Sequence, residues 1–197
     1  MNGEKERIRE RYLKKRSAIR DDDRKSQSAA VLRQCSSSSF FLEADLILAF
    51  SPLPEEIDIS GIRGICEEAG KRIAYPKVSG EDMDFYEVFP GEPLSEGVFH
   101  VKEPVLRDFQ KPIAPERAIC LTPGAVFDGF GNRYGYGKGY YDRYFARFPE
   151  LLRIGVCFAQ QISEKPLPVE PQDMRVHYLL TQNGIAGCST GYGHFVS

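Results

Sequence analysis

The chain begins with two segments in which apolar residues recur at helical spacing. The first of these segments predicts an amphipathic surface helix over residues 4–19. A second helix is predicted over about 23–35. The run Asp21-Asp22-Asp23 is typical of an N-cap and first turn, where carboxylates meet free backbone amides and the positive end of the helix dipole. The serines at 36–39 end this helix.

From residue 45 onward, short apolar runs typical of strands alternate with helical segments. The expected strands are 45–50, 72–75 (ending at Pro76), 84–89, 117–121, 153–158 and 177–181, and the expected helices are 58–70 and 139–148. Five prolines over 90–116 indicate a long irregular crossover, and 122–139 reads as a glycine-rich loop. The alternation favours an α/β fold with three layers, α/β/α, around a mostly parallel, Rossmann-like central sheet.

The domain organisation predicted from this pattern is simple. We expect a single α/β domain over 1–182 that includes the N-terminal basic helix. A polar, glycine-rich tail is expected over 183–197. The sequence contains no internal repeat.

Composition and charge narrow the function classes. The chain has 197 residues, 42% of them hydrophobic, which is enough to bury a core. Its 26 basic and 28 acidic residues give a net charge of −2, and so offer no overall reason to bind nucleic acid or an anionic membrane. No apolar stretch approaches the roughly 20 residues of a membrane span. The charged N-terminus lacks the apolar core of a signal peptide, so we expect a cytoplasmic protein.

The cysteines and histidines predict neither disulfides nor a zinc site. The five cysteines are an odd number, and none lies within four residues of another, which fits reduced thiols. The three histidines show no metal-ligand spacing and are interpreted as structural or tail residues. The cysteines are Cys35, Cys66, Cys120, Cys157 and Cys188, and the histidines are His100, His177 and His194.

The strongest chemical signal is the segment GNRYGYGKGYYDRYF, which follows a predicted strand. Glycines at 135, 137 and 139 free the backbone to turn successive N–H groups toward one anion. Arg133 and Lys138 add positive charge, and a helix starting near Gly139 adds its dipole. The segment matches neither the P-loop nor the dinucleotide-binding pattern. It therefore indicates a phosphate site of another kind, the alternative being a tight strand-to-helix turn. Asp142 is a candidate ligand for Mg²⁺.

This segment closely resembles the signature loop of the 5-formyltetrahydrofolate cyclo-ligases, also called 5,10-methenyltetrahydrofolate synthetases. Other similar segments follow the family's order along nearly the whole chain: Lys5, Arg9 and Arg16 near the start, FSPLPEEID at 50–58, GVFHVKEP at 97–104, PGAVFD at 123–128 and Asp173 in PQDMRV. The chain also departs from the family pattern. His177 and Gln182 stand where the family commonly has acids, Gln172 where it often has histidine, His100 where it often has glycine, and Tyr134 where it usually has leucine.

The resemblance implies an enzyme that cyclises 5-formyltetrahydrofolate to 5,10-methenyltetrahydrofolate, using ATP and Mg²⁺ and releasing ADP and phosphate. It assigns catalytic roles to Arg133 and Lys138 and magnesium binding to Asp142, with Asp173 as a helper. The ATP-binding residues it implies are Lys5, Arg9, Arg133, Gly135, Tyr136, Gly137, Lys138, Gly139, Tyr140 and Tyr141. The folate-binding residues it implies are Phe50, Ser51, Glu56 and Tyr140.

Two other interpretations remain open at this stage. The same sheet and phosphate loop could serve a sugar-phosphate isomerase or a CoA-transferase relative, whose strand topology we expect the domain to share. Such an isomerase would not depend on ATP. A nucleic-acid-binding adaptor could use the basic helix, because residues 1–33 carry a net charge of +5, although acidic residues interleave the basic ones. We expect a monomer that acts on a small-molecule folate, without nucleic-acid or membrane partners.

Overall fold

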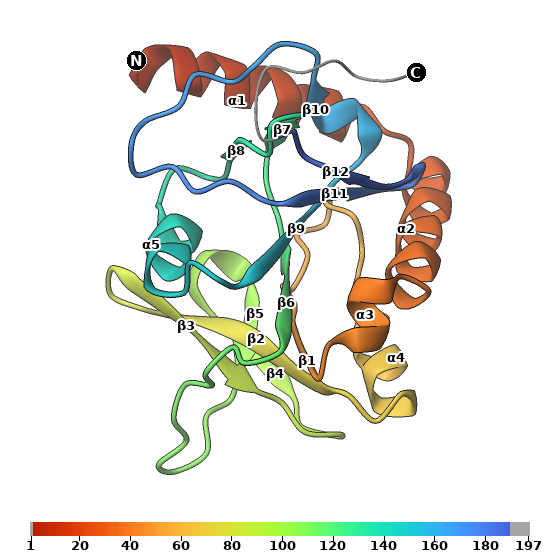
Figure 1. Cartoon of the computed structure of the whole chain (residues 1–197), viewed down its shortest axis with the longest axis vertical. Helices are drawn as coiled ribbons and strands as arrows, with labels where there is room; N and C mark the ends of the chain where they lie inside the picture. Colours follow the sequence, from red (N-terminus) through yellow and green to blue (C-terminus); the bar gives the residue numbers. More distant parts are fainter. Residues whose placement is uncertain (1, 190–197) are drawn as a thin grey trace.

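A mostly parallel sheet of seven strands forms the centre of the molecule (Figure 1). The structure is a computed structural model that describes residues 2–189. The strand order is β12-β11-β9-β6-β1-β2-β3. The five inner strands pair in parallel, and the edge strands β12 and β3 are antiparallel to their neighbours. The strands are β1 (Leu46–Leu48), β2 (Arg72–Ser79), β3 (Asp82–Glu87), β6 (Ala118–Thr122), β9 (Leu152–Val156), β11 (Tyr178–Thr181) and β12 (Gly184–Gly187).

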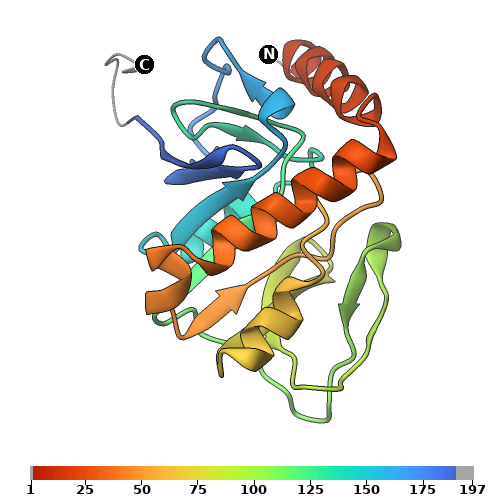
Figure 2. The same ribbon diagram turned by 90° about the vertical axis from the view of Figure 1, so that its right-hand side faces the viewer.

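Helices flank this sheet on both faces. The helices are α1 (Asn2–Ser17), α2 (Asp21–Ser36), α3 (Ser39–Glu43), α4 (Ile62–Glu68) and α5 (Tyr140–Arg147). Val31, Phe41 and Ile62, from α2, α3 and α4, pack into one core cluster, and Figure 2 shows α2 running across its face of the sheet. Tyr144 and Phe145 of α5 form the second cluster with residues of β1, β3 and β6. The expected helices and parallel strands are therefore present.

The segment that the sequence indicates as loop contributes two strands to a small three-stranded sheet. This sheet joins β10 (Ile162–Ser163), β7 (Val126–Asp128) and β8 (Arg133–Tyr134). The buried Asp128 carboxylate accepts hydrogen bonds from the backbone N–H groups of Phe130, Asn132 and Leu167, at 2.7–3.0 Å. The expectation of an uninterrupted loop over 122–139 is therefore wrong, because this carboxylate stabilises a tight turn between two very short strands.

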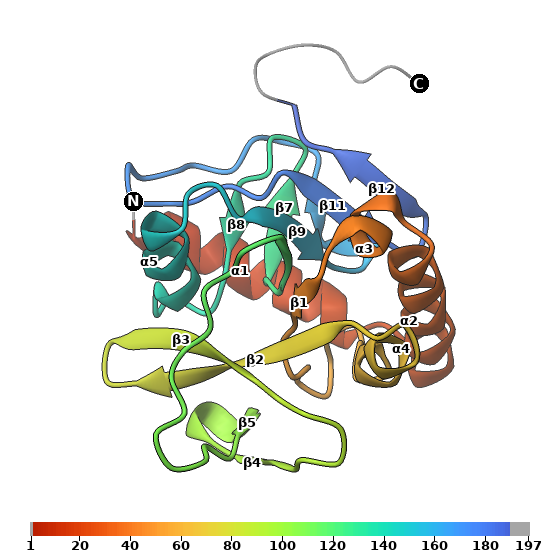
Figure 3. The same cartoon turned by 60° about the horizontal axis from the view of Figure 1, so that its bottom comes forward.

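The crossover over 90–116 contains only short elements, as expected. They are β4 (Leu94–Glu96), the 3-10 turn η1 (Val98–His100) and β5 (Lys102–Pro104). β4 and β5 pair with each other in an antiparallel arm, which lies beside β2 and β3 in Figure 3.

Three further boundaries differ from those that the sequence predicts. β2 continues through Pro76. The proline is tolerated because β1 pairs with β2 only over Arg72–Ala74, so that at Pro76 the strand pairs with β3 alone. The short helix α3 follows the serine run, with the Ser38 hydroxyl accepting a hydrogen bond from the Phe41 N–H. β12 takes up the first part of the expected tail, while 190–197, including His194, lies outside the described residues.

The structure also bears on two expectations from composition, the state of the cysteines and the lack of a membrane span. Cys35, Cys66, Cys120 and Cys157 are buried, Cys188 is half-buried, and all five are free thiols. Within 2–189, no helix has the length and hydropathy that a membrane crossing requires.

A buried arginine without a carboxylate partner lies where β9 meets β11. Arg153 is 7% exposed, and its Nε and Nη1 atoms have no hydrogen-bond partner among residues 2–189. Its Nη2 lies 2.9 Å from Nε2 of His177, and its backbone N–H donates to His177 Nδ1 at 3.0 Å. Burial, and then the charge of Arg153, lower the pKa of His177. The imidazole is therefore held neutral beside the guanidinium.

We predict that protonation of His177 destabilises the folded protein at acid pH. Because the pKa of His177 is lower in the folded than in the unfolded state, the unfolded chain binds the proton first, and stability falls as the pH drops below about 6.5. Urea unfolding of the wild type and of His177→Asn between pH 5 and 8 measures this loss. Because His177→Asn lacks the titrating group, the wild type should lose stability relative to the variant on acidification; parallel pH profiles would contradict the prediction.

Candidate active site

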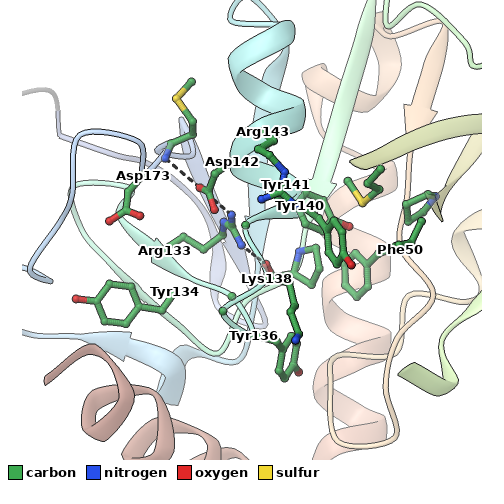
Figure 4. Close-up of a pocket in the computed structure, with 18 of the residues that line it drawn as sticks. Phe50, Arg133, Tyr134, Tyr136, Lys138, Tyr140, Tyr141, Asp142, Arg143 and Asp173 are labelled. Carbon is green, nitrogen blue, oxygen red and sulfur yellow. Dashed lines mark hydrogen bonds and ion pairs between the residues drawn. The ribbon is translucent and has the colours of Figure 1, made fainter. Parts of the chain in front are cut away.

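A cavity of about 840 Å³ lies at the carboxyl ends of the central parallel strands. The segments after β1 and β6 contribute Phe50, Ser51 and Pro123, and the glycine loop over 135–139 forms another wall. Open α/β sheets bind ligands at this edge, because the loops that leave parallel strands gather there. In Figure 4, residues of the glycine loop, of α5 and of the loop after β1 surround the same space.

The backbone of the glycine loop requires glycine at two positions. Gly137 and Gly139 have φ angles of 84° and 69°, in the left-handed region that side chains disfavour. A Cβ atom at Gly139 would also lie 2.8 Å from Nη1 of Arg143. Gly139 directly precedes α5, so the first amides of that helix adjoin the loop. The arrangement supplies backbone donors and a helix N-terminus to one place, as the sequence predicts for a phosphate site.

Arg133 supplies a buried positive charge beside the loop. Its side chain is 3% exposed, and Nη2 donates to Asp142 Oδ1 at 3.2 Å. The same carboxylate oxygen accepts the Met174 N–H at 3.0 Å, and Figure 4 shows both contacts. Nε of Arg133 is buried and has no hydrogen-bond partner in the part of the chain that the structure describes. A guanidinium with an unused donor at the wall of a cavity fits an anionic ligand.

Helix α1 turns a row of cations toward the cavity. Lys5 donates to Asp173 Oδ2 at 2.6 Å and to Glu170 Oε2 at 2.9 Å. Burial alone would lower the pKa of Lys5, but the hydrogen bonds to Asp173 and Glu170 outweigh it, so the pKa is raised. Arg9, one helical turn further on, donates from Nε to the Gly135 carbonyl at 2.8 Å. Both side chains line the cavity, so this part of the helix is not a solvated basic face.

Glu56 is buried at the opposite wall, in the loop after β1, and is 6% exposed. Its Oε1 accepts the Tyr136 hydroxyl at 2.6 Å and lies 3.4 Å from Arg16 Nη1, and its Oε2 accepts the Leu53 N–H at 2.9 Å. Burial raises the pKa of Glu56, and these three donors oppose the shift. The carboxylate has the burial and the donor-accepting geometry to recognise a ligand with N–H groups.

Aromatic and polar side chains complete the wall near Glu56. Phe50 is 3% exposed, and its neighbour Ser51 donates from Oγ to the Lys102 carbonyl at 2.7 Å. Tyr140 and Tyr141 come from the first turn of α5, and the guanidinium of Arg133 lies 5.4 Å from the centre of the Tyr141 ring. A flat, partly apolar ligand fits such a surface.

The structure therefore brings every predicted site residue to one cavity. Its lining includes Lys5, Arg9, Phe50, Ser51, Glu56, Arg133, Gly135, Tyr136, Gly137, Lys138, Gly139, Tyr140, Tyr141, Asp142 and Asp173. Sequence reasoning assigned no role to Arg16, Glu103 or Glu170. Arg16 shares a helix face with Lys5 and Arg9, and that spacing was a usable signal. Glu103, which is 4% exposed and lines the cavity, belongs to the family-like segment at 97–104, and that segment was its signal.

The carboxylates of the cavity are suited to a magnesium ion with few protein ligands, and not to a metal ion that is fully coordinated by side chains. Within 2–189, no group of three or more His, Cys, Asp or Glu side chains is arranged to hold a metal ion. Asp142 and Asp173 are neighbours, since Asp142 accepts the N–H of the residue that follows Asp173. One or two carboxylates beside a phosphate site match the way proteins hold Mg²⁺, which keeps several waters. His100 is exposed and pairs with Glu96, and His177 lies at Arg153, so neither lies at this site.

Comparisons with known proteins match this chain over nearly its whole length. The model of the "5-formyltetrahydrofolate cyclo-ligase family" matches residues 1–182. A probable 5-formyltetrahydrofolate cyclo-ligase of Schizosaccharomyces pombe is 24% identical over 173 residues, 79% of this chain and 84% of the relative. The cyclo-ligase of Escherichia coli K12 is 28% identical over 148 residues, 72% and 80% of the two chains. The solution structure of an Aquifex aeolicus 5,10-methenyltetrahydrofolate synthetase superimposes with a TM-score of 0.80 at 29% identity, covering 98% of this chain and 96% of that one.

We predict that Lys5→Met lowers the free energy of unfolding by about 1–3 kcal/mol, between the values for exposed and buried ion pairs. The substitution leaves Glu170 and Asp173 half-buried without their cation. Urea unfolding measures the change, with Lys14→Met, an exposed lysine of the same helix, as control. Equal stability of the two variants would show that the Lys5 contacts do not hold α1 in place.

Proposed function

The chain belongs to the 5-formyltetrahydrofolate cyclo-ligase family, and from this premise we propose how its cavity performs the reaction. The protein is an enzyme of folate one-carbon metabolism that converts 5-formyltetrahydrofolate into 5,10-methenyltetrahydrofolate. The family's members are ATP-dependent ligases. One observation carries the proposal: a single cavity joins a glycine loop and its cations to a buried carboxylate flanked by aromatic side chains.

The phosphates of ATP bind at the glycine loop. The amides of Gly135, Gly137 and Gly139 and the N-terminus of α5 donate to phosphate oxygens, and Lys138 and Arg133 neutralise charge on the transferred group. Lys5 and Arg9 approach the same loop from α1. Tyr136, Tyr140 and Tyr141 complete the nucleotide side of the cavity. Phosphoryl transfer needs this positioning and charge neutralisation more than it needs a covalent nucleophile.

Asp142 would hold Mg²⁺, with Asp173 as a second carboxylate. Asp142 already faces Arg133 and the Met174 N–H through one oxygen, Oδ1, which leaves Oδ2 for the ion. Asp173 is paired with Lys5, so its contribution depends on sharing its carboxylate with that lysine. When bound, the ion neutralises charge on the phosphate chain and orients it.

The folate binds at the opposite wall. Glu56 accepts hydrogen bonds from the amino group and ring N–H of the pterin, since a buried carboxylate offers charge-assisted acceptors to a pair of donors. Phe50 and Tyr140 flank the ring system, and Ser51 supports the loop that carries Phe50 through its bond to the Lys102 carbonyl. The formyl group then faces the phosphate loop across the cavity.

The reaction that this arrangement favours is a phosphorylation followed by ring closure. The formyl oxygen attacks the γ-phosphorus of ATP, and ADP leaves. The resulting iminium phosphate carries a far better leaving group than the formyl oxygen. N10 of the folate attacks the formyl carbon and loses its proton, and inorganic phosphate departs with the former formyl oxygen. Arg133 and Lys138 stabilise the charge that develops on the phosphoryl oxygens.

We further propose the finer features expected from the sequence. The fold is three-layered and Rossmann-like, with the strand topology of sugar-phosphate isomerases and CoA-transferases. The enzyme works as a cytoplasmic monomer without nucleic-acid or membrane partners. An isomerase activity on sugar phosphates would share the fold but would not consume ATP, so nucleotide dependence separates the two functions.

The proposed function predicts that purified protein with Mg²⁺ and ATP converts 5-formyltetrahydrofolate into a product with the absorption band of the methenyl compound. The product should not form when ATP is omitted. Absence of the band in a folded sample with all three components present would end the proposal.

Lys138→Ala should lower kcat/KM by about 10²–10³, the usual cost of removing one donor that stabilises a transition state. The side chain is exposed, so the fold should survive, which circular dichroism checks. Lys25→Ala, an exposed lysine on α2, is the matched control and should keep wild-type kinetics. Equal kcat/KM values for the two variants would show that Lys138 does not contact the transferred phosphoryl group.

A further inference from the structure

The Tyr136 side chain joins the two halves of the cavity. Tyr136 belongs to the glycine loop, on the nucleotide side, yet its hydroxyl donates to Glu56 Oε1 on the folate side at 2.6 Å. Arg16 Nη1 donates to the same hydroxyl at 2.9 Å and lies 3.4 Å from Glu56 Oε1. Three segments far apart in the sequence, the end of α1, the loop after β1 and the glycine loop, therefore meet at one buried carboxylate.

The contact is charge-assisted, and the tyrosine keeps its proton. Burial and then the negative charge of Glu56 raise the pKa of Tyr136, so the hydroxyl is the donor and Glu56 the acceptor. Arg16 is 3% exposed, and its guanidinium lies 5.9 Å from the centre of the Tyr136 ring. Tyr136 as a whole residue is 44% exposed, so the position of its side chain depends on this polar anchor more than on packing.

The oxygen that Tyr136 occupies is one that a ligand needs. Oε1 of Glu56 already faces two donors, and Oε2 receives the Leu53 N–H at 2.9 Å. A ligand that presents a pair of N–H donors to this carboxylate must displace at least one of them. The Leu53 amide is fixed in the backbone of the same loop, and Arg16 is buried. The partly exposed tyrosine is the donor that can leave.

A ligand on the nucleotide side disturbs the same contact. Gly137 and Gly139, the two loop positions with left-handed φ angles, lie directly beyond Tyr136, so a phosphate held by the loop amides acts on the segment that carries the tyrosine. Arg9 holds the Gly135 carbonyl on the near side of Tyr136 at 2.8 Å, so adjustment is concentrated in 136–139. In Figure 4, Tyr136 and Lys138 extend together from this stretch.

We propose that Tyr136 is a positioning residue that couples folate binding to nucleotide binding. It forms a latch between the glycine loop and Glu56 that either ligand must open. Whichever ligand binds first breaks the Tyr136–Glu56 hydrogen bond, and the second then binds without that cost, so each tightens the binding of the other. The inference rests on the proposed function, because it assigns the folate to Glu56 and the nucleotide to the glycine loop.

The test is calorimetric titration of the full-length protein with 5-formyltetrahydrofolate and with Mg·AMP-PNP. Each ligand is titrated alone and in the presence of saturating amounts of the other. In the wild type, each should tighten the other at least about fivefold, the lower end of typical coupling between sites. In Tyr136→Phe, which keeps the ring and loses the hydroxyl, the coupling should fall to near onefold. The folate alone should bind more tightly than to the wild type.

Tyr134→Phe is the matched control. It removes a hydroxyl from β8, directly before the glycine loop, but that hydroxyl donates to the Pro168 carbonyl and not to Glu56, so the coupling should stay at the wild-type value. A merely structural role of Tyr136 would weaken the binding of each ligand alone, opposite to the expected gain for folate. The two results therefore differ in sign.

Three outcomes would overturn the inference. Undiminished coupling in Tyr136→Phe would show that another contact joins the two sites. Absence of coupling in a wild type that binds both ligands would exclude the latch and leave the proposed function intact. Failure of the folded wild type to bind either ligand would overturn the proposed function and the latch together.

Discussion

The cavity depends on the burial of a charged helix face. Lys5, Arg9 and Arg16 of α1 point inward, where ordinary helices place apolar side chains, and burying cations is costly unless each is paired. Each finds an acceptor: Lys5 the carboxylates at 170–173, and Arg9 and Arg16 two neighbouring residues of the glycine loop, through the Gly135 carbonyl and the Tyr136 hydroxyl beside Glu56. The same contacts therefore hold α1 in place and position the residues of the site.

Most of the fold could be predicted from local pattern, because helices and buried parallel strands carry strong periodic signals. What could not be predicted depends on contacts distant in sequence. The hairpin of β7 and β8 is stabilised by buried Asp128, which also accepts the N–H of Leu167, 39 residues away. β2 continues past Pro76 because its neighbour β1 is short. β12 forms because β11 offers an edge to a segment that is polar and glycine-rich.

The residues of the site also differ in whether the local sequence predicts them. The sequence predicted a phosphate site at the glycine loop with Arg133, Lys138 and Asp142, since these residues are close together in the sequence and the loop acts partly through its backbone. The convergence of α1 and the loop after β1 on that segment was implied only by resemblance. The Tyr136–Glu56 contact spans 80 residues and leaves no local signal.

Amide hydrogen exchange with and without Mg·AMP-PNP tests the central claim, that the backbone between residues 133 and 142 holds the phosphates. The account predicts that the nucleotide slows exchange most at the amides of the glycine loop and the first turn of α5, with smaller protection on the inner face of α1. Protection confined to other segments, in a sample that binds the nucleotide, would contradict the claim.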